Sequence, residues 1–305
     1  MNTVSTNISD LILLIGEGNR KALARAITMV ENAMEGSENL LKQIQLKEIP
    51  VIGFTGPPGS GKSTLINAFL RHIIANKKKA AVIAVDPTSP FNFGSLLADR
   101  IRMAEHFNNE QIFIRSIASR GSLGGLSEKI IEITDVLKSS DFDFIIIETV
   151  GVGQSEVEIA GLADTTIVVV VPESGDDIQA MKSGIMEIAD IFVVNKSDRD
   201  GSDTIVNNLN KMISYNSNSG WVTPVISTVA TKGEGIDLLF EKIVLHRNSS
   251  QFNKKKILLL AEKVYQLVRN ARMNNLRRED IVKKLENESK DYSFNLYKFV
   301  EQFKN

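Results

Sequence analysis

Seven short apolar runs recur between residues 49 and 247, separated by stretches whose apolar residues follow a spacing of three and four. The runs read VIGFTG, AAVIAVD, QIFIRSI, FDFIIIETVG, TTIVVVVP, IFVVNKSD and PVISTVA. They lack the alternation of polar and apolar residues that marks a strand with one solvent-exposed face. Each is therefore typical of a strand that is buried on both faces of its sheet. Strands alternating with helices predict an α/β fold with a doubly wound, mostly parallel sheet.

Both ends of the chain carry a helical pattern instead. Residues 8–35 place Leu11, Ile15, Leu23, Ile27 and Val30 at helical spacing, with a break at residues 16–19, and a second helical piece covers residues 38–46. Residues from 257 to 271 return to the same spacing. We therefore expect an N-terminal helical extension at 1–48, an α/β domain at 49–247 and a tail of two or three helices at 248–305.

Composition narrows the class of protein further. A formal net charge of -1 gives no global reason to bind nucleic acid or an anionic membrane, and no apolar run has the length of a membrane span. The tail is locally basic, with 13 Lys or Arg against 7 Asp or Glu in residues 251–305, and this is typical of a solvated or dimer-contacting face. The chain has no cysteine and three histidines, so a transition-metal site is not expected. The first ten residues do not resemble a signal peptide, and we expect a cytoplasmic protein.

A phosphate-binding motif follows directly after the first apolar run. Residues 56–63 read GPPGSGKS, which fits the pattern G-x-x-x-x-G-K-[ST] between a strand and a helix. In this pattern backbone N–H groups wrap a phosphate, the lysine (Lys62) reaches the β- and γ-oxygens, and the serine (Ser63) ligates magnesium. The glycines leave room for the anion, and the helix that begins near Lys62 points its positive end at it.

A second motif indicates which base the nucleotide carries. Residues 195–198 read NKSD and follow a buried strand. The Asp198 carboxylate can accept from the N1–H and the exocyclic amine of guanine, a pair of donors that adenine lacks. The Lys196 stem can lie across the base, and Asn195 can tie this loop to the phosphate loop.

Carboxylates at other strand ends are candidates to bind the metal ion. Glu148 and Gly151 end the run FDFIIIETVG, where nucleotide hydrolases of this class place an acid near magnesium and a glycine near the γ-phosphate. Asp86 ends AAVIAVD, and Asp99 follows in LLADRIRM. Magnesium needs only one or two protein carboxylates, so not all three are required as direct ligands. Asp86 as a helix cap and Asp99 as a surface charge are the structural alternatives.

Taken together, these segments resemble the MeaB/ArgK GTPases, accessory proteins of adenosylcobalamin-dependent acyl-CoA mutases. The resemblance covers about residues 11–245 and includes GNRKALARAITMVE, AVDPTSPF, FIRSIASRGSLGGL, ETVGVGQSE and GEGIDLL. It implies a Mg²⁺-dependent P-loop GTPase that converts GTP to GDP, a mutase partner and a homodimer. The implied catalytic residues are Lys62, Asp86 and Glu148, and the implied metal ligands are Ser63, Asp86, Asp99 and Glu148. The residues expected to bind the nucleotide are Gly56, Pro57, Pro58, Gly59, Ser60, Gly61, Lys62, Ser63, Thr64, Gly151, Asn195, Lys196, Asp198, Val229 and Ala230.

Arg102 and the segment SGDDIQAMKSG at 174–184 match switch regions that respond to the mutase. In that segment Asp176, Gln179 and Lys182 have no role in the nucleotide motifs, and their alternative is an ordinary helix start.

The chain departs from the family pattern at three places. Phe93 stands where the family commonly has a glycine, and Ser122 stands where it commonly has a histidine. Val229-Ala230 replaces the family's usual Ser-Ala pair. These departures bear on switch timing and base affinity. Gln154 could orient water, but it lies three residues after Gly151 rather than one. The alternative functions are a metal-inserting GTPase of the hydrogenase or urease kind, a transport-system kinase, and a structural dimer that binds nucleotide without turnover.

Overall fold

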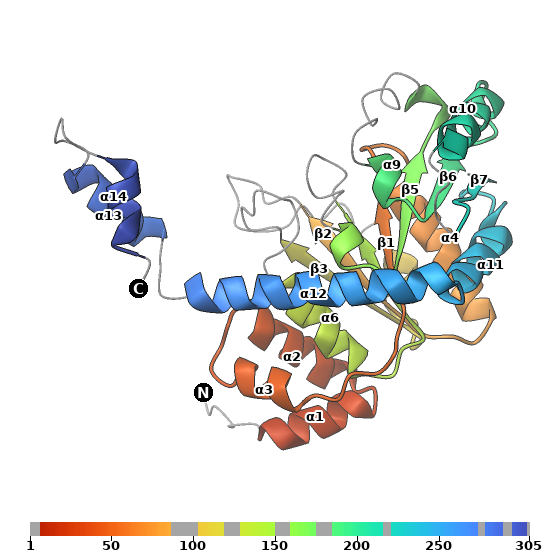
Figure 1. Ribbon diagram of the computed structural model, residues 1–305. Coiled ribbons are helices and arrows are strands. Elements are labelled where there is room, and N and C mark those ends of the chain that lie inside the picture. The colour runs from red at the N-terminus through yellow and green to blue at the C-terminus, as the bar shows by residue number, and fades with distance from the viewer. Residues whose placement is uncertain are drawn as a thin grey trace. The chain divides into compact units, whose positions relative to one another are not determined.

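The structure, a computed structural model, describes residues 7–86, 103–118, 129–149, 159–174, 185–215, 221–273, 278–288 and 295–303. The chain divides into two units by its internal contacts, Met1–Ile257 and Leu258–Asn305. The first unit contains the sheet and all elements up to the start of the tail (Figure 1).

A seven-stranded sheet forms the centre of the first unit. Its strand order is β3-β2-β4-β1-β5-β6-β7, and every pairing among these strands is parallel. The strands are β1 (Val51–Thr55), β2 (Ala80–Asp86), β3 (Ile112–Ala118), β4 (Phe144–Glu148), β5 (Thr165–Val170), β6 (Ile191–Asn195) and β7 (Val225–Thr228). The predicted doubly wound sheet is confirmed. Because β1 lies between β4 and β5, the loop after β1 leaves the middle of the sheet, where ligands of such folds bind.

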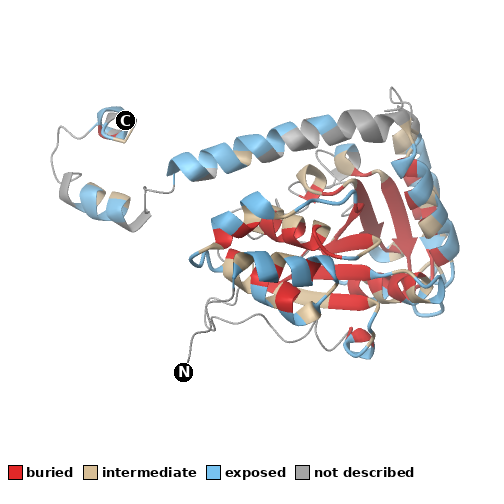
Figure 2. Cartoon of the chain, turned by 90° about the horizontal axis from the view of Figure 1, so that it is seen from below, coloured by how far each residue is buried: buried red, intermediate tan, exposed pale blue. Residues whose placement is uncertain are grey.

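Helices cover both faces of this sheet. On one face, α1 (Ile8–Gly16), α2 (Arg20–Glu31), α3 (Ser37–Gln43) and α6 (Ile130–Lys138) share a hydrophobic cluster with β2, β3 and β4. On the other, α4 (Lys62–Ala75) and α11 (Ile236–Arg247) share one with β1, β2 and β4–β7. A third cluster packs α10 (Ser202–Tyr215) on β5 and β6. Successive residues of β2 alternate between the first two clusters, which explains its uninterrupted apolar run. Most strand residues and the inner helix faces are buried, although parts of β3 and β7 are less so (Figure 2).

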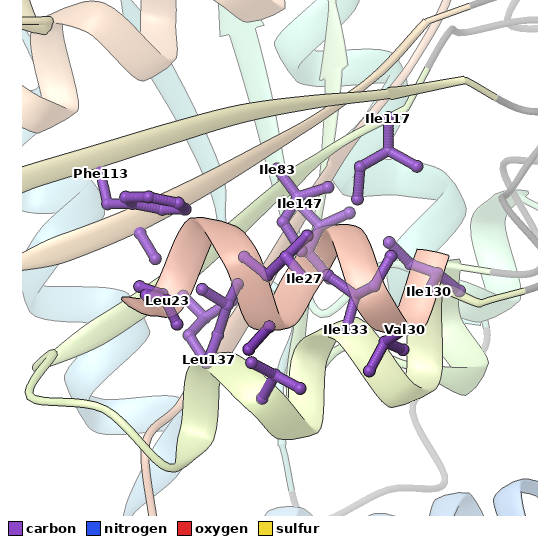
Figure 3. Close-up of a cluster of buried hydrophobic side chains, with 14 of the residues drawn as sticks. Leu23, Ile27, Val30, Ile83, Phe113, Ile117, Ile130, Ile133, Leu137 and Ile147 are labelled. Carbon is purple, nitrogen blue, oxygen red and sulfur yellow. The ribbon is translucent and has the colours of Figure 1, made fainter. Parts of the chain in front are cut away.

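The N-terminal helices contribute to the same core as the sheet. Helix α2 begins where the Asn19 side chain accepts from two backbone N–H groups, as an N-cap residue does. Its Leu23, Ile27 and Val30 point toward side chains of the sheet and of α6 (Figure 3). Arg115 on β3 donates to the Glu31 carboxylate at 2.9 Å and so links the sheet to α2. These helices are therefore part of the packed first unit.

Three helices make up the described part of the tail: α12 (Ser250–Met273), α13 (Arg278–Glu288) and α14 (Leu296–Glu301). Shorter elements complete the chain: η1 (Ala104–His106), η2 (Ile159–Gly161), η3 (Pro172–Ser174) and α9 (Ile185–Ile188). Within the described ranges, the helices are too short or too polar to span a bilayer.

Candidate active site

Glycines let the loop after β1 approach its neighbours more closely than any other residue could. Gly56 has φ 134°, and a Cβ there would lie 2.1 Å from the Val169 carbonyl oxygen of β5. Gly61 has φ 85°, and its Cβ would lie 2.4 Å from Nδ2 of Asn195. Both residues have a positive φ, and neither position has room for a Cβ, so only glycine fits there. The loop after β1, here the phosphate loop, thus packs closely against β5 and the end of β6.

Lys62 opens α4 directly after this loop. Its side chain is buried, and Nζ donates to the carbonyl oxygens of Gly56 at 2.7 Å and Pro57 at 3.1 Å. Helix α4 runs for 14 residues from Lys62, so the N–H groups of its first turn and the positive end of its dipole lie at the loop. A cation, a helix start and a glycine loop at one place make an anion site suited to a polyphosphate.

The loop at residues 195–199, here the guanine loop, is tied to the phosphate loop. Asn195 is buried; its Nδ2 donates to the Ser60 carbonyl at 3.0 Å, and its Oδ1 accepts from Thr228 Oγ1 and from the Ala230 N–H. Lys196, with φ 56°, donates from Nζ to the Gly59 carbonyl at 2.8 Å. The Asn195 side chain thus links the guanine loop to the phosphate loop, to the end of β7 and to the turn after β7.

A pocket of about 160 Å³ opens beside these contacts. It is lined by Gly61, Thr64, Asn195, Lys196, Asp198, Arg199, Val229, Ala230 and Thr231. Seven of these nine were expected at the nucleotide from the sequence. Arg199 and Thr231 were not, although each directly follows a residue that was. The pocket joins the guanine loop to the turn after β7, as a base site requires.

The proposed metal side of the site lies at the start of α4. Ser63 Oγ donates to Glu148 Oε1 at 2.7 Å, and both residues are buried. Glu148 ends β4, which pairs with β1, so the sheet itself brings it beside the phosphate loop. Asp86 ends β2 on the other side of β4, but its side chain lies outside the described structure. Among the described residues, no cluster of three or more His, Cys, Asp or Glu forms a metal site.

Two threonines that the sequence analysis did not select support this region. Thr149 Oγ1 donates to Thr55 Oγ1 at 3.0 Å, and the Thr149 N–H donates to the Phe54 carbonyl at 3.1 Å. These bonds hold the chain after Glu148 against the end of β1. Hydroxyl pairs of this kind leave no sequence motif.

The remaining expected site residues fall outside the described part of the chain, and their predictions stay predictions. They are Phe93, Asp99, Arg102, Ser122, Gly151, Gln154, Asp176, Gln179 and Lys182.

Solved structures share this architecture. A crystal structure titled LAO/AO transport system kinase is similar over 99% of this chain and 97% of its own, with a TM-score of 0.69 and 26% identity. HypB from Helicobacter pylori in complex with nickel is similar over 75% of this chain and 96% of its own, with a TM-score of 0.51. At 18% identity the HypB likeness concerns the fold alone.

Proteins related by sequence share a higher percentage of identical residues with this chain than these solved structures do. A protein from Pyrococcus abyssi named as a GTPase is 43% identical over 86% of this chain and 84% of its own. GTPase ArgK of Escherichia coli is 40% identical over 65% of this chain and 62% of its own. The profile described as methylmalonyl Co-A mutase-associated GTPase MeaB matches residues 23–289. The chain is thus a GTPase that binds guanine nucleotide, and it belongs to the MeaB family.

Proposed function

We propose that this GTPase is a cytoplasmic accessory protein of an adenosylcobalamin-dependent acyl-CoA mutase. Its GTP cycle gates cofactor loading and protects the mutase. The observation that carries this proposal is the match of residues 23–289 to a family described as mutase-associated. A relative named methylmalonic aciduria type A homolog from Caenorhabditis elegans, 38% identical over 64% of this chain, supports the same link.

In the nucleotide complex, the phosphates occupy the glycine loop and the base occupies the 160 Å³ pocket. Lys62 exchanges its bonds with the Gly56 and Pro57 carbonyls for the β- and γ-oxygens, which carry full negative charge. Asp198 accepts from guanine N1–H and N2–H. The side chain of Lys196, held on the Gly59 carbonyl, covers the base.

Ser63 and Glu148 would hold Mg²⁺. A hydroxyl and a carboxylate oxygen 2.7 Å apart, both shielded from water, are the hard oxygen donors that Mg²⁺ prefers, so the residues fit the ion. Bound Mg²⁺ would neutralise charge on the β- and γ-phosphates. Asp86 and Asp99 are the further candidate ligands; Asp86 is the last residue of β2, a strand that pairs with β4.

Hydrolysis proceeds by in-line attack of water on the γ-phosphorus, with the bond to the β–γ bridging oxygen breaking to release GDP and phosphate. Lys62 and the N-terminal N–H groups of α4 stabilise the charge that develops on these oxygens. Glu148 and Asp86 orient groups around the phosphates. Gly151 is assigned to the γ-phosphate, and Gln154 is a candidate to orient the water.

Segment 174–184 couples the site to the partner. It begins at the last residue of η3, beyond the carboxyl end of β5, whose Val169 carbonyl lies close to the phosphate loop at Gly56. A change at the γ-phosphate and a change at a partner surface can therefore act on one stretch of chain. Asp176, Gln179 and Lys182 are assigned to the mutase contact, together with Arg102.

Two other functions are less well supported. A metal-inserting GTPase would need metal ligands, but the chain has no cysteine, and its histidines belong to three separate places: His72 on α4, His106 in η1 and His246 on α11. A transport kinase would need an acceptor site, and the described base pocket suits guanine rather than the usual ATP of kinases.

We also propose a homodimer formed through the tail. Exposed residues on α12 follow a repeat of four and three positions: Ile257, Ala261, Val264, Val268 and Ala271. Val264 is 58% exposed and Ile257 71%. An apolar seam with a 3.5-residue period is typical of a helix that packs against another helix. A second copy of α12 is the partner we assign.

Base selectivity tests the assignment of Asp198. We expect Asp198→Asn to weaken GDP binding roughly tenfold or more, because hydrogen bonds to a charged group contribute about 1.5–3 kcal/mol. Preference should shift toward xanthosine diphosphate. Calorimetry with GDP, XDP and ADP measures both effects. Asp200→Asn, an equal change of charge on an exposed residue of the same turn, is the control. Equal affinity of the wild type for ATP and GTP would contradict the assignment.

The chemical step tests Lys62 and Glu148. We expect Lys62→Ala and Glu148→Gln each to lower single-turnover phosphate release on the order of a hundredfold, since each removes stabilisation of developing charge. Circular dichroism should show an unchanged fold. Glu132→Gln, which alters a buried carboxylate on α6, is the matched control and should keep its turnover. Normal release in both site variants would refute their roles.

Mutase stimulation tests the coupling segment. Asp176→Ala, Gln179→Ala and Lys182→Ala should keep intrinsic GTP turnover and GTP affinity but lose stimulation by the mutase. The measurement is turnover with and without the purified mutase from the same organism. Stimulation that survives in all three variants returns the segment to a structural role, and a wild type that the mutase neither binds nor stimulates overturns the proposed function.

Light scattering tests the dimer. The full chain should be a dimer, and both truncation after Asn248 and Val264→Glu should give a monomer, because a charge in an apolar seam is left unpaired. Gln266→Glu introduces the same charge outside the seam and should stay dimeric. A monomeric full chain, or a truncated dimer, would contradict the assignment.

A further inference from the structure

An ion pair joins the guanine loop to the chain after β5. The Arg199 guanidinium donates from its NH1 group to Oε1 of Glu173 in η3. Arg199 also lines the base pocket, directly after the guanine acceptor Asp198. None of the nucleotide motifs requires either member of this pair.

The sheet explains why the two residues meet. Strands β5 and β6 are parallel neighbours, with Val170 opposite Val194. Glu173 follows three residues after the end of β5 and Arg199 four residues after the end of β6, so both leave the same edge of the sheet. A tight turn, in which the Arg199 N–H donates to the Lys196 carbonyl at 3.0 Å, directs Arg199 back toward η3.

Glu173 lies near both cations of the guanine loop. Its pKa is lowered, first by the hydrogen bond from Arg199 and to a smaller degree by the charges of Arg199 and Lys196. Lys196 in turn binds the Gly59 carbonyl of the phosphate loop. Glu173 is therefore an acid at the neighbouring strand end that lies near the basic side chains of the guanine loop.

We propose that the Glu173–Arg199 ion pair is a positioning contact that holds the guanine loop against the end of β5 and slows release of bound guanine nucleotide. The pair restrains the residue next to Asp198 and one wall of the base pocket. The contact joins the guanine loop to η3 at the base pocket, so we assign it to nucleotide release and not to the chemical step. This inference rests on the GTPase activity alone and requires no mutase.

The size and salt dependence of the effect follow from exposure. Each side chain is 52% exposed, and ion pairs at such sites shift equilibria by about two- to fivefold. At about 1 M salt the Debye length is about 3 Å, so the contribution should largely disappear. A role in packing alone would not depend on salt in this way.

The experiment measures release of a fluorescent GDP analogue from the full chain after addition of excess GDP, at low and at high salt. Glu173→Gln and Arg199→Gln should each release GDP about two- to fivefold faster than wild type at low salt, with the difference lost at about 1 M salt. The exchanged pair, Glu173→Arg with Arg199→Glu, should restore slow release. Asp200→Asn removes one negative charge from the same turn without touching the pair and should match the wild type.

Two further measurements distinguish a positioning role from a general loss of structure or activity. Single-turnover phosphate release and melting temperature should be unchanged in Glu173→Gln. Wild-type release rates in Glu173→Gln overturn the proposal. Glu173→Arg and Arg199→Glu are also measured singly. An exchanged pair whose effect on release equals the product of these two single effects likewise overturns the proposal, because additivity means that the residues do not interact.

Discussion

The active site depends on how the carbonyl groups of the phosphate loop are satisfied. Lys62 binds the carbonyls of Gly56 and Pro57, Lys196 binds that of Gly59, and Asn195 binds that of Ser60. Backbone carbonyl groups need hydrogen-bond donors, and here side chains supply them. These contacts hold the phosphate loop in place between the start of α4 and the guanine loop.

The same contacts join the proposed base site and the proposed phosphate site into one unit. Asn195 spans the phosphate loop, the end of β7 and the turn at Ala230, and any shift of the base pocket would break bonds in all three. Gly61 allows this closeness, since a Cβ there would collide with the Asn195 amide. A substitution at Gly61 would therefore disturb the base pocket as well as the phosphate loop.

Much of this fold could be predicted because its signals are local. Buried parallel strands leave uninterrupted apolar runs, and the start of α4 at Lys62 follows from the motif itself. Helix ends were less accurate. The helix expected at 38–46 is α3, Ser37–Gln43, because Ile44 is extended and the Lys47 N–H binds the Lys138 carbonyl across the fold. Such a tertiary contact leaves no trace in the local pattern.

The site residues that the sequence analysis missed share one property. No motif specifies these residues: Thr149 stands at a variable position of ETVG, and Arg199 and Thr231 each follow a motif residue. They reach this region because parallel strands end at one edge of the sheet. Thr149 meets Thr55 across 94 residues of sequence. Motif reasoning identifies groups whose spacing along the chain is fixed by chemistry. It cannot identify groups whose partner is fixed by the order of strands in a sheet.

Strand β5 connects the two ends of the nucleotide site. Its Val169 carbonyl limits the phosphate loop at Gly56, and four residues later Glu173 meets the guanine loop. The Gly56 carbonyl, which accepts from Lys62, lies at the point where the phosphate loop approaches β5. The same strand leads into η3, where Glu173 binds Arg199 of the guanine loop. The phosphate loop and the guanine loop are therefore both positioned against one strand, and the order of strands in the sheet fixes how far apart they lie.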